Sequence, residues 1–411
     1  MRSWLAPLLA TSTLVATLLH MAAARAQVVV TTASAVSFED AISMARNAAP
    51  DLNVARANEL VAKAGIGVAG IYPNPTVSFG TNTKYAKLSA GVSIPLIILG
   101  QVGASTDAAR AEYNTVTVES QMVWNEVRTA TEHAFVDLWR AEQLSLAREQ
   151  AGLLAGKVDD TVRARVEVGS APEIEALRSH AERLRAEADA LEAKQLVGSS
   201  RSVLGRFIGV PGGLGVHTVG EPTIPLALPT LADLSARVGS SPAVRREQAD
   251  AAAAEARAHR ERVFVRPLLT LDLGIDKYDP GIEGTNYRAA IGVEIPIFSM
   301  RGPLIEREEA FASVAKARAI SEQTRLTAEL TAAYLTFEAA SARVKALAEG
   351  VVPAAELAAD ATRDSYALGR APLVSVLDAE RARIDARVSL IEARASRANA
   401  WIEVEHIVGN R

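Results

Sequence analysis

The chain has 411 residues with 44 basic and 48 acidic side chains, which gives a net charge of −4, and it contains no cysteine. The lack of cysteine excludes disulfides, thiolate metal sites and thiol nucleophiles, and the six scattered histidines lack metal-ligand spacing. The balanced charge offers no basic surface for nucleic acid, and the low aromatic content of 5% with abundant alanine is typical of long helices and coiled coils.

The first 26 residues have the features of a secretory signal peptide. Arg2 supplies the positive charge, residues 5–21 are mostly apolar, and Ala24-Arg25-Ala26 fits the cleavage rule, so the mature chain is expected to begin at Gln27. A transmembrane anchor is the alternative, but this apolar run is short and contains a proline. Later segments lack the ~20 apolar residues that a membrane helix needs. We therefore expect export without a helical membrane span.

Two helices are expected before the first strands. Ser37 and Asp40 form a capping-box pattern at the start of a helix that runs to about Ala48. Pro50 separates it from a second helix, which extends over about residues 51–71 and ends before two further prolines.

The hydrophobic period then changes from that of a helix to that of a strand. Apolar residues alternate with polar or small ones over residues 77–85 and again over residues 88–94, and Pro95 is expected to end the second strand. This pattern predicts a strand pair in which each strand has one apolar face.

A long helical hairpin follows the strand pair. No proline interrupts residues 103–165, which predicts a rod over 60 residues long, or roughly 95 Å at ~1.5 Å per residue. Gly169 allows the chain to reverse, and a returning helix is expected from about Pro172 to Ile208. This returning helix and the helix before the strands have summed lengths that nearly match the rod. We therefore expect both to pack end to end along it.

The second half of the chain repeats the first, about 200 residues later. The matching segments are 71–75 with 263–267, 91–96 with 292–297, 163–172 with 363–372, and 204–209 with 404–409. The expected organisation is a signal peptide at 1–26, a first repeat at 27–210, a proline-rich linker at 211–229 and a second repeat at 230–411. The first repeat is expected to contain strands at about 75–96 and a long helical hairpin at 100–208. The second is expected to contain strands at about 267–298 and a long helical hairpin at 302–408.

The second repeat shows the same periods as the first. Alternation over residues 269–275 and 287–295 predicts two more strands, and the following helical run reaches Tyr366 with only Pro353 inside. A heptad seam lies in this run at Leu326, Leu330, Ala333, Phe337, Ala340, Val344 and Leu347, and a similar seam in the first rod lies at Val123, Val127, Ala130, Ala134, Leu138 and Ala141.

The four strands indicate a membrane barrel built from several chains. Four strands cannot close a barrel, because small barrels need about eight, and an open sheet would leave its apolar face and edges uncovered. Tilted strands of ~9–11 residues span a bilayer. Apolar-out and polar-in alternation at this length is the pattern of outer-membrane barrels. Three chains would supply 12 strands.

These features resemble the TolC family of outer-membrane efflux proteins over about residues 36–409. The resemblance rests on the duplicated order of helices and strand pairs and on four short motifs: Tyr72-Pro-Asn-Pro75, Ile94-Pro95, Ile295-Pro296, and Tyr366-x-x-Gly369 followed by Leu377-Asp378-Ala379. It implies a mostly α fold with a small β part. Tandem-repeat α-helical hairpins would form a trimeric periplasmic tunnel, and four β-strands per chain would contribute to a 12-stranded outer-membrane barrel.

The same resemblance implies the function. The homotrimer would be a passive duct, not an enzyme, without cofactor or metal, and it would dock on a periplasmic adaptor (membrane fusion) protein and an inner-membrane pump. Heavy-metal cations or drugs are the expected substrates, and the compact C-terminus is similar to that of the heavy-metal cation efflux branch.

The resemblance also implies a gate at the periplasmic tip. Tyr366 and Asp378 match the tyrosine and aspartate of the family's gate, and Glu175 takes the place of an acidic partner in the first repeat. The position that holds an arginine in the family's gate is occupied here by Ala371, one residue after Arg370. We therefore expect Tyr366, Arg370, Asp378 and Glu175 to bias the tunnel towards closure. The alternative is that these charges are only solvated, because surface pairs contribute ~0–1 kcal/mol each.

The strand alternation also predicts which charges face the barrel lumen. These are Lys84, Asp272, Asp276, Arg288 and Glu294. Two positive and three negative charges sum to −1 per chain, so we expect a mild preference for cations.

No catalytic constellation emerges from the sequence. Asp159 and Asp160 are expected to be a solvated pair on a long helix, and the glycines at 212–215 follow no strand, so they do not fit a dinucleotide loop. Two other classes stay open. A periplasmic coiled-coil structural or stalk protein would explain the rods but not the strands, and a ligand-gated porin would explain the strands but not the rods.

Overall fold

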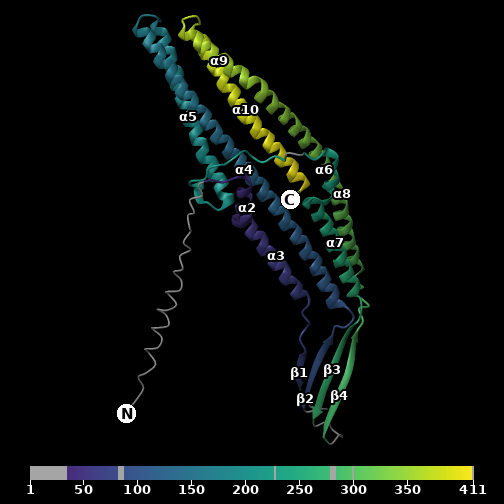
Figure 1. Cartoon of the computed structure of the whole chain (residues 1–411). Helices are drawn as coiled ribbons and strands as arrows, with labels where there is room; N and C mark the ends of the chain where they lie inside the picture. The colour runs from purple at the N-terminus through teal and green to yellow at the C-terminus, as the bar shows by residue number, and fades with distance from the viewer. Residues whose placement is uncertain (1–34, 82–87, 226–227, 278–283, 299, 410–411) are drawn as a thin grey trace, which may run out of the picture.

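The computed structural model describes residues 35–81, 88–225, 228–277, 284–298 and 300–409, so the expected signal peptide lies outside the described residues. Long helices run side by side from a small sheet at one end to two tight turns at the other (Figure 1). The first repeat contains α2 (Phe38–Ala48), α3 (Pro50–Ala69), β1 (Thr76–Gly80), β2 (Leu88–Leu96), α4 (Gln101–Glu167) and α5 (Glu173–Ile208). The second contains α6 (Leu231–Arg237), α7 (Pro242–Val263), β3 (Leu268–Lys277), β4 (Thr285–Glu294), α8 (Gly302–Ala346), α9 (Val352–Ala367) and α10 (Leu373–Val408).

The predicted start of the first helices is confirmed. The Asp40 backbone amide donates to the Ser37 hydroxyl at 3.2 Å, and the Asp40 carboxylate accepts in return from the Ser37 backbone, so two of the free donors at the start of α2 are satisfied. Pro50 occupies the first turn of α3, where its missing N–H costs no hydrogen bond.

The structure also confirms the long helical rods and the expectation that two shorter helices pack end to end along each of them. Helix α4 has 67 residues and is therefore about 100 Å long at ~1.5 Å per residue. Helices α3 and α5 pack along different parts of α4, while α7 and α10 pack in the same way along the α8–α9 rod (Figure 1). Each repeat is thus one long helix paired with two shorter ones.

The second rod contains a local irregularity that the first rod lacks. A π-helical turn, Leu347–Val351, joins α8 to α9 directly before Pro353. Proline has no N–H to donate to the carbonyl four residues earlier, and its ring crowds that carbonyl, so a widened turn accommodates it without ending the helix. Leu153 occupies the corresponding place in α4, which continues without interruption.

The helices pack on aromatic and aliphatic side chains near the middle of the rods. Phe38 of α2 meets Phe135 of α4 edge to face at 5.3 Å between ring centroids, and Phe337 of α8 packs against Trp401 of α10 at 5.1 Å. Both predicted heptad seams contribute to these cores, with Leu138 and Leu330 among their fully buried members.

Both hairpins reverse through the same turn. The Ser170 amide donates to the Arg165 carbonyl at 2.8 Å, and the Arg370 amide donates to the Ser365 carbonyl at 2.8 Å, so both α4 and α9 end in the same six-residue cap. Gly169 and Gly369 have φ values of 73° and 71°, a conformation that residues with a Cβ rarely adopt. The repeat visible in the sequence is therefore a repeat of backbone geometry.

The described strands form one antiparallel sheet in the order β1-β2-β3-β4. Strand pairing within each repeat follows the prediction, and β2 pairs with β3 across the two repeats. The expected end of β2 at Pro95 is wrong by one residue, because pairing with β3 continues to Leu96. Strand β1 reaches only as far as Ser93, so Pro95 lies where one side of β2 is a free edge and its missing N–H breaks no bond. The first strand was expected to extend to Tyr85, but residues 82–87 lie outside the described part.

Candidate functional site

The register places the side chains of the sheet on two chemically different faces. Rows of paired residues such as Val77-Val92-Leu273-Ala289 run across all four strands, and because paired residues point to the same side, the alternation in each strand adds up to one face. The apolar face consists of Val77, Phe79, Leu88, Ala90, Val92, Ile94, Leu96, Leu269, Leu271, Leu273, Ile275, Tyr287, Ala289, Ile291 and Val293, with the polar pair Lys277 and Thr285 at one end.

The opposite face carries the charges that the sequence predicted for the lumen. Asp272, Asp276, Arg288 and Glu294 all lie on this face, while Lys84 is outside the described residues. An Arg288 Nη atom lies 3.2 Å from a carboxylate oxygen of Asp276, so one positive and one negative charge are paired across strands β3 and β4. Asp272 and Glu294 remain as excess negative charge among the described residues of this face.

Small residues separate these charges. Where Arg288 crosses β3 the neighbouring residue is Gly274, and a Cβ there would lie 3.0 Å from the guanidinium. At Gly292 a Cβ would lie 2.4 Å from the hydroxyl oxygen of Thr270, so any other residue there would force the Thr270 side chain to move. The polar face is therefore a thin layer of glycine, serine and a few long charged side chains.

At the other end of the molecule, Tyr366 is held by both helices of the first hairpin. The ring comes from α9 and is only 4% exposed, in an apolar cluster with Val162 and Leu373. Its hydroxyl donates to a carboxylate oxygen of Glu175 on α5 at 3.1 Å. Burial raises the pKa of Tyr366 above its usual value, and the nearby Glu175 charge adds to this effect, so the hydroxyl keeps the proton that it donates.

Arg165, a residue that the sequence reasoning missed, completes this contact. Its guanidinium lies over the Tyr366 ring with 4.5 Å to the centroid and donates to the Tyr366 carbonyl oxygen at 2.8 Å. This carbonyl belongs to the last turn of α9, where a positive charge is favourable. We call Arg165, Glu175 and Tyr366 the tip latch. The sequence signal for Arg165 was its position four residues before Gly169, where its side chain can reach across the turn.

The structure does not bring the other two expected gate residues to Tyr366. Asp378 is 67% exposed, and its nearest ion-pair partner is Arg381 on its own helix at 3.9 Å. Arg370 is exposed in the turn after α9, and its backbone amide closes the turn. In the described part of the chain, neither side chain forms a hydrogen bond or ion pair with Arg165, Glu175 or Tyr366.

A second link joins the repeats a few turns from the tip. Arg381 of α10 binds Glu182 of α5 with two hydrogen bonds, at 2.9 and 2.5 Å. This hydrogen bonding lowers the pKa of Glu182. The latch and this pair together fasten the second hairpin to α4 and α5 of the first.

The expectation that Asp159 is solvated is wrong. Its side chain is fully buried, accepts from the Ser179 hydroxyl at 2.7 Å and lies 2.9 Å from the Arg163 guanidinium, whereas Asp160 is exposed as expected. Burial alone would raise the pKa of Asp159, but the Ser179 hydrogen bond and the Arg163 charge outweigh it, so the pKa lies below the usual value. Asp159 therefore ties α4 to α5 as a charged group.

Asp159→Asn is expected to lower the free energy of unfolding by about 1–3 kcal/mol, because it removes a buried charge-assisted contact, while Asp160→Asn should have almost no effect. A lowered folded-state pKa stabilises the protein above the unfolded value of 3.8, and this contribution is lost as the pH falls through the folded-state pKa. Thermal unfolding of detergent-solubilised protein should show a difference between wild type and Asp159→Asn at neutral pH that shrinks below pH 3.8. Equal effects of the two variants would contradict the assignment.

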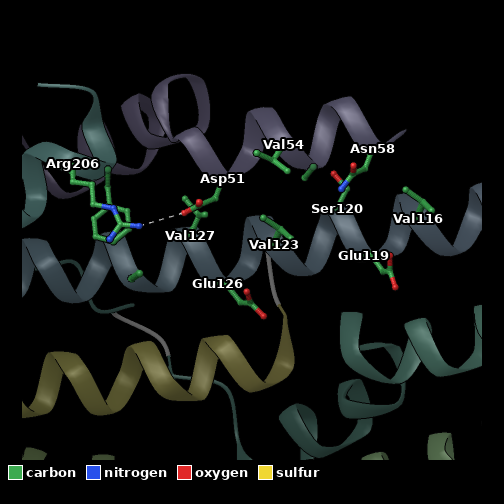
Figure 2. Close-up of a pocket in the computed structure, with 13 residues that line it drawn as sticks. Asp51, Val54, Asn58, Val116, Glu119, Ser120, Val123, Glu126, Val127 and Arg206 are labelled. Atoms are coloured by element: carbon green, nitrogen blue, oxygen red, sulfur yellow. Dashed lines mark ion pairs between the residues drawn. The ribbon is translucent and has the colours of Figure 1, made fainter. Parts of the chain in front are cut away.

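A groove of about 560 Å³ lies between α3 and α4 (Figure 2). Val54 and Val123 contribute apolar surface, and Arg206 of α5 closes one end through an ion pair of 3.8 Å with Asp51. The lining combines aliphatic and aromatic side chains with amide, hydroxyl, carboxylate and guanidinium groups. Of the expected site residues that the structure describes, none lines this groove.

Among the described residues, no cluster of three histidine or acidic side chains could hold a metal ion. The helices of that part of the chain also include none that is both long and apolar enough to cross a membrane.

Comparison with known proteins agrees with this geometry. Residues 235–410 match the family described as outer membrane efflux protein. The cobalt-zinc-cadmium resistance protein CzcC of Cupriavidus metallidurans is 24% identical over 388 residues, which cover 92% of this chain and 91% of CzcC. Among solved structures, CusC, which forms a transmembrane channel, is similar with a TM-score of 0.74 and 17% identity over 91% of this chain and 92% of CusC. The outer membrane protein VceC of Vibrio cholerae has a TM-score of 0.72 and 17% identity over 91% of this chain and 96% of VceC.

Proposed function

We propose that this chain belongs to the TolC family of outer membrane efflux proteins and forms, as a homotrimer, the channel of a tripartite efflux system. The protein is located in the outer membrane, with its helical rods in the periplasm. Its partners in this proposal are a periplasmic adaptor protein, which contacts the helical tip, and an inner-membrane pump.

The observation that carries the proposal is the two-faced sheet joined to paired rods. Strands β3 and β4 have ten residues each, which is the length of a tilted strand that spans a bilayer. The sheet of one chain has two free edges, β1 and β4, which in water would invite further pairing. Joining three copies edge to edge removes all free edges and creates a 12-stranded barrel with the apolar face outside.

The pore is a passive duct in this proposal. Its walls offer small side chains and separated charges, so a solute meets no group placed to react with it. An external pump must therefore supply the energy of export.

We propose divalent heavy-metal cations as the main substrates. The similarity to CzcC, a cobalt-zinc-cadmium resistance protein, extends over most of both chains. The excess carboxylates Asp272 and Glu294 of the lumen face favour cations, and because they are separated they would attract a metal ion without holding it. Drugs are the second candidate, because their passage would need only the width of the duct.

The experiment combines two measurements. The purified protein, reconstituted in planar bilayers, should migrate as a trimer in unboiled gels and conduct ions. Deleting the gene should sensitise cells to cobalt, zinc or cadmium, and the wild-type gene should restore growth. A trimer that does not conduct would favour the stalk protein, and conduction without sensitisation to metals or drugs would favour a porin.

We further propose that the tip latch holds the periplasmic end of the tunnel closed. Its contacts lie between the hairpins of one chain, so opening requires the second hairpin to move away from the first. The exposed Arg370 and Asp378 are free to contact a neighbouring copy and thus to add to closure across the trimer.

A further inference from the structure

A histidine of the first repeat and a glutamate of the second meet on the surface of the rods. His133 of α4 lies beside Glu403 of α10, with 3.0 Å between its Nε2 atom and a carboxylate oxygen, although 270 residues separate the two in the chain. Their side chains are 30% and 51% exposed, so a solute can reach both. Asn399, about one turn before Glu403 on α10, contacts the other ring nitrogen, with 2.9 Å between its Oδ1 atom and Nδ1 of His133.

The contact with Asn399 determines where the neutral His133 ring carries its proton. An amide oxygen can only accept a hydrogen bond, so the proton is on Nδ1 and the lone pair is on Nε2. This lone pair and the Glu403 carboxylate then face each other at 3.0 Å, which is unfavourable unless a cation lies between them. A proton can take this place, and so can a metal ion, which displaces the proton.

The spacing of the pair suits a divalent metal ion. Zinc binds nitrogen and oxygen ligands at about 2.0–2.2 Å, so two ligand atoms on one ion lie roughly 3–3.4 Å apart. Histidines that bind a metal through one ring nitrogen commonly donate from the other nitrogen to an oxygen, and this second contact fixes the tautomer. Asn399 occupies the place of that oxygen partner.

His406, at the same interface between α4 and α10, has the opposite hydrogen bonds. The Asn125 amide nitrogen donates to the His406 carbonyl at 3.0 Å, which orients the amide, and it also lies 3.2 Å from Nδ1 of the His406 ring. The Thr129 hydroxyl lies 3.0 Å from the same Nδ1 atom. Nδ1 therefore accepts, the neutral ring carries its proton on Nε2, and neither nitrogen offers a free lone pair to a metal. His406 is thus a control for His133 within the same interface.

The His133–Glu403 pair lies on the face of the rods opposite to the linker. On α4 the linker contacts Glu142, which accepts two hydrogen bonds from it at 3.0 and 2.6 Å. On α10 it contacts Arg394, which forms an ion pair of 2.8 Å with a linker glutamate. Glu142 follows His133 by nine residues, and Glu403 follows Arg394 by nine. Nine residues are about two and a half turns of an α-helix, so on both helices the pair lies on the side away from the linker.

This opposite face borders the duct in the trimer proposed above. Helix α2 also packs on the linker side, against Phe135 of α4, about two turns before the residue that binds the linker. A closed tube has space for such an additional layer only on its outside, so His133 faces the inside. The exposed Glu126 and Asp137 of α4 lie on the same side of the helix, about two turns and one turn from His133, and attract cations, although Arg140 at 3.6 Å partly neutralises Asp137.

We propose that His133 and Glu403 bind a divalent metal cation such as zinc or cobalt during its passage through the tunnel. The ligands are Nε2 of the ring and the carboxylate, with water at the other positions, and Asn399 is a positioning residue. Imidazole and carboxylate together suit divalent ions of this class. Two protein ligands among several waters hold an ion weakly, as conduction requires, because the ion must leave again. This proposal rests on the export of metal cations proposed above.

The test is a calorimetric titration of the detergent-solubilised trimer, prepared without a histidine tag, with zinc chloride at neutral pH. The wild type should bind one zinc ion per chain at this site, and His133→Gln and Glu403→Gln should each abolish this binding. Asn399→Ala keeps both ligands and should weaken it by about 10–100-fold. His406→Gln, the matched control, should bind zinc like the wild type, and unboiled gels should show the trimer for every variant.

Zinc binding that persists in His133→Gln would overturn the site, and so would an equal loss of binding in His406→Gln. The position of the site is tested in planar bilayers under a potassium chloride gradient. Zinc should shift the reversal potential of the wild type towards a lower preference for cations, because the bound ion adds positive charge inside the duct, and it should not shift that of His133→Gln. Zinc binding without this shift would overturn the role of the pair in transport. If zinc binds and shifts the potential as expected but cells without the gene tolerate metals normally, the site stands and the metal substrates of the proposed function are wrong.

Discussion

Leu271→Arg is expected to abolish most of the assembled outer-membrane trimer, whereas Asp272→Arg, one residue further along β3, should assemble like the wild type. Leu271 lies in the inner part of β3 and pairs with Ile94 and Ile291 on the apolar face. An arginine near the middle of a bilayer costs about 2–4 kcal/mol, and every copy in the trimer would bear this cost. Asp272 lies on the opposite face, where a long cation can extend into a water-filled lumen.

The measurement is the fraction of heat-modifiable trimer in outer-membrane extracts, compared on unboiled and boiled gels. The two variants introduce the same side chain at adjacent positions, and Asp272→Arg changes the net charge more than Leu271→Arg does, so an effect of overall charge alone would be larger in the control variant. Equal loss of trimer in both would show that the two faces of the sheet are assigned wrongly. Asp272→Arg also adds two units of positive charge per chain to the lumen, and it should reduce the preference of the open channel for cations.

The double variant Arg165→Ala/Tyr366→Phe is expected to raise the single-channel conductance of the reconstituted trimer and to sensitise cells to large antibiotics such as vancomycin. It removes the hydrogen bond to Glu175, the hydrogen bond from Arg165 and the contact between guanidinium and ring. Contacts of this kind contribute about 0.5–3 kcal/mol each, and every ~1.4 kcal/mol changes the ratio of closed to open states tenfold. The yield of trimer should stay unchanged, because the tip is remote from the sheet.

Glu173→Ala is the matched control for the latch. Glu173 is exposed in the first turn of α5, two residues before Glu175, and it takes no part in the contacts of Tyr366. Its replacement should leave conductance unchanged. If Arg370→Ala or Asp378→Ala opens the channel while the latch variant does not, closure depends on contacts between copies and the latch within the chain is not the gate.

Much of the architecture could be predicted because it is encoded in short segments. The capping box at Ser37, the cap glycines Gly169 and Gly369 and the alternation in the strands each depend on neighbours within a few residues, and each was found where it was expected. The repeat helped further, since every element appeared twice. The facing of Asp272, Asp276 and Arg288 also followed from alternation alone, because in a strand the side chains change face at every residue.

The errors occurred where a residue's environment is made by a distant part of the chain. Asp159 has the sequence context of a solvated pair with Asp160, but Ser179, on the returning helix, buries it and binds it. Pro95 looked like the end of a strand, yet it is tolerated because β1 is too short to reach it. Neither fact is visible in the local sequence.

The sequence by itself determined the order of elements, their lengths, the tandem repeat and the two faces of the sheet, because backbone geometry imposes periods of 2.0 and 3.6 residues on the hydrophobic pattern. Only the tertiary structure decided the pairing of β2 with β3, the role of Arg165 and the geometry by which Tyr366 meets Arg165 and Glu175. Glu175 and Arg165 lie 191 and 201 residues away from it in the chain, and the packing of one hairpin on the other brings them together. Contacts between residues so far apart in the chain depend on how each long helix is rotated about its axis and shifted along it relative to the other. The hydrophobic period of a single helix does not specify either quantity.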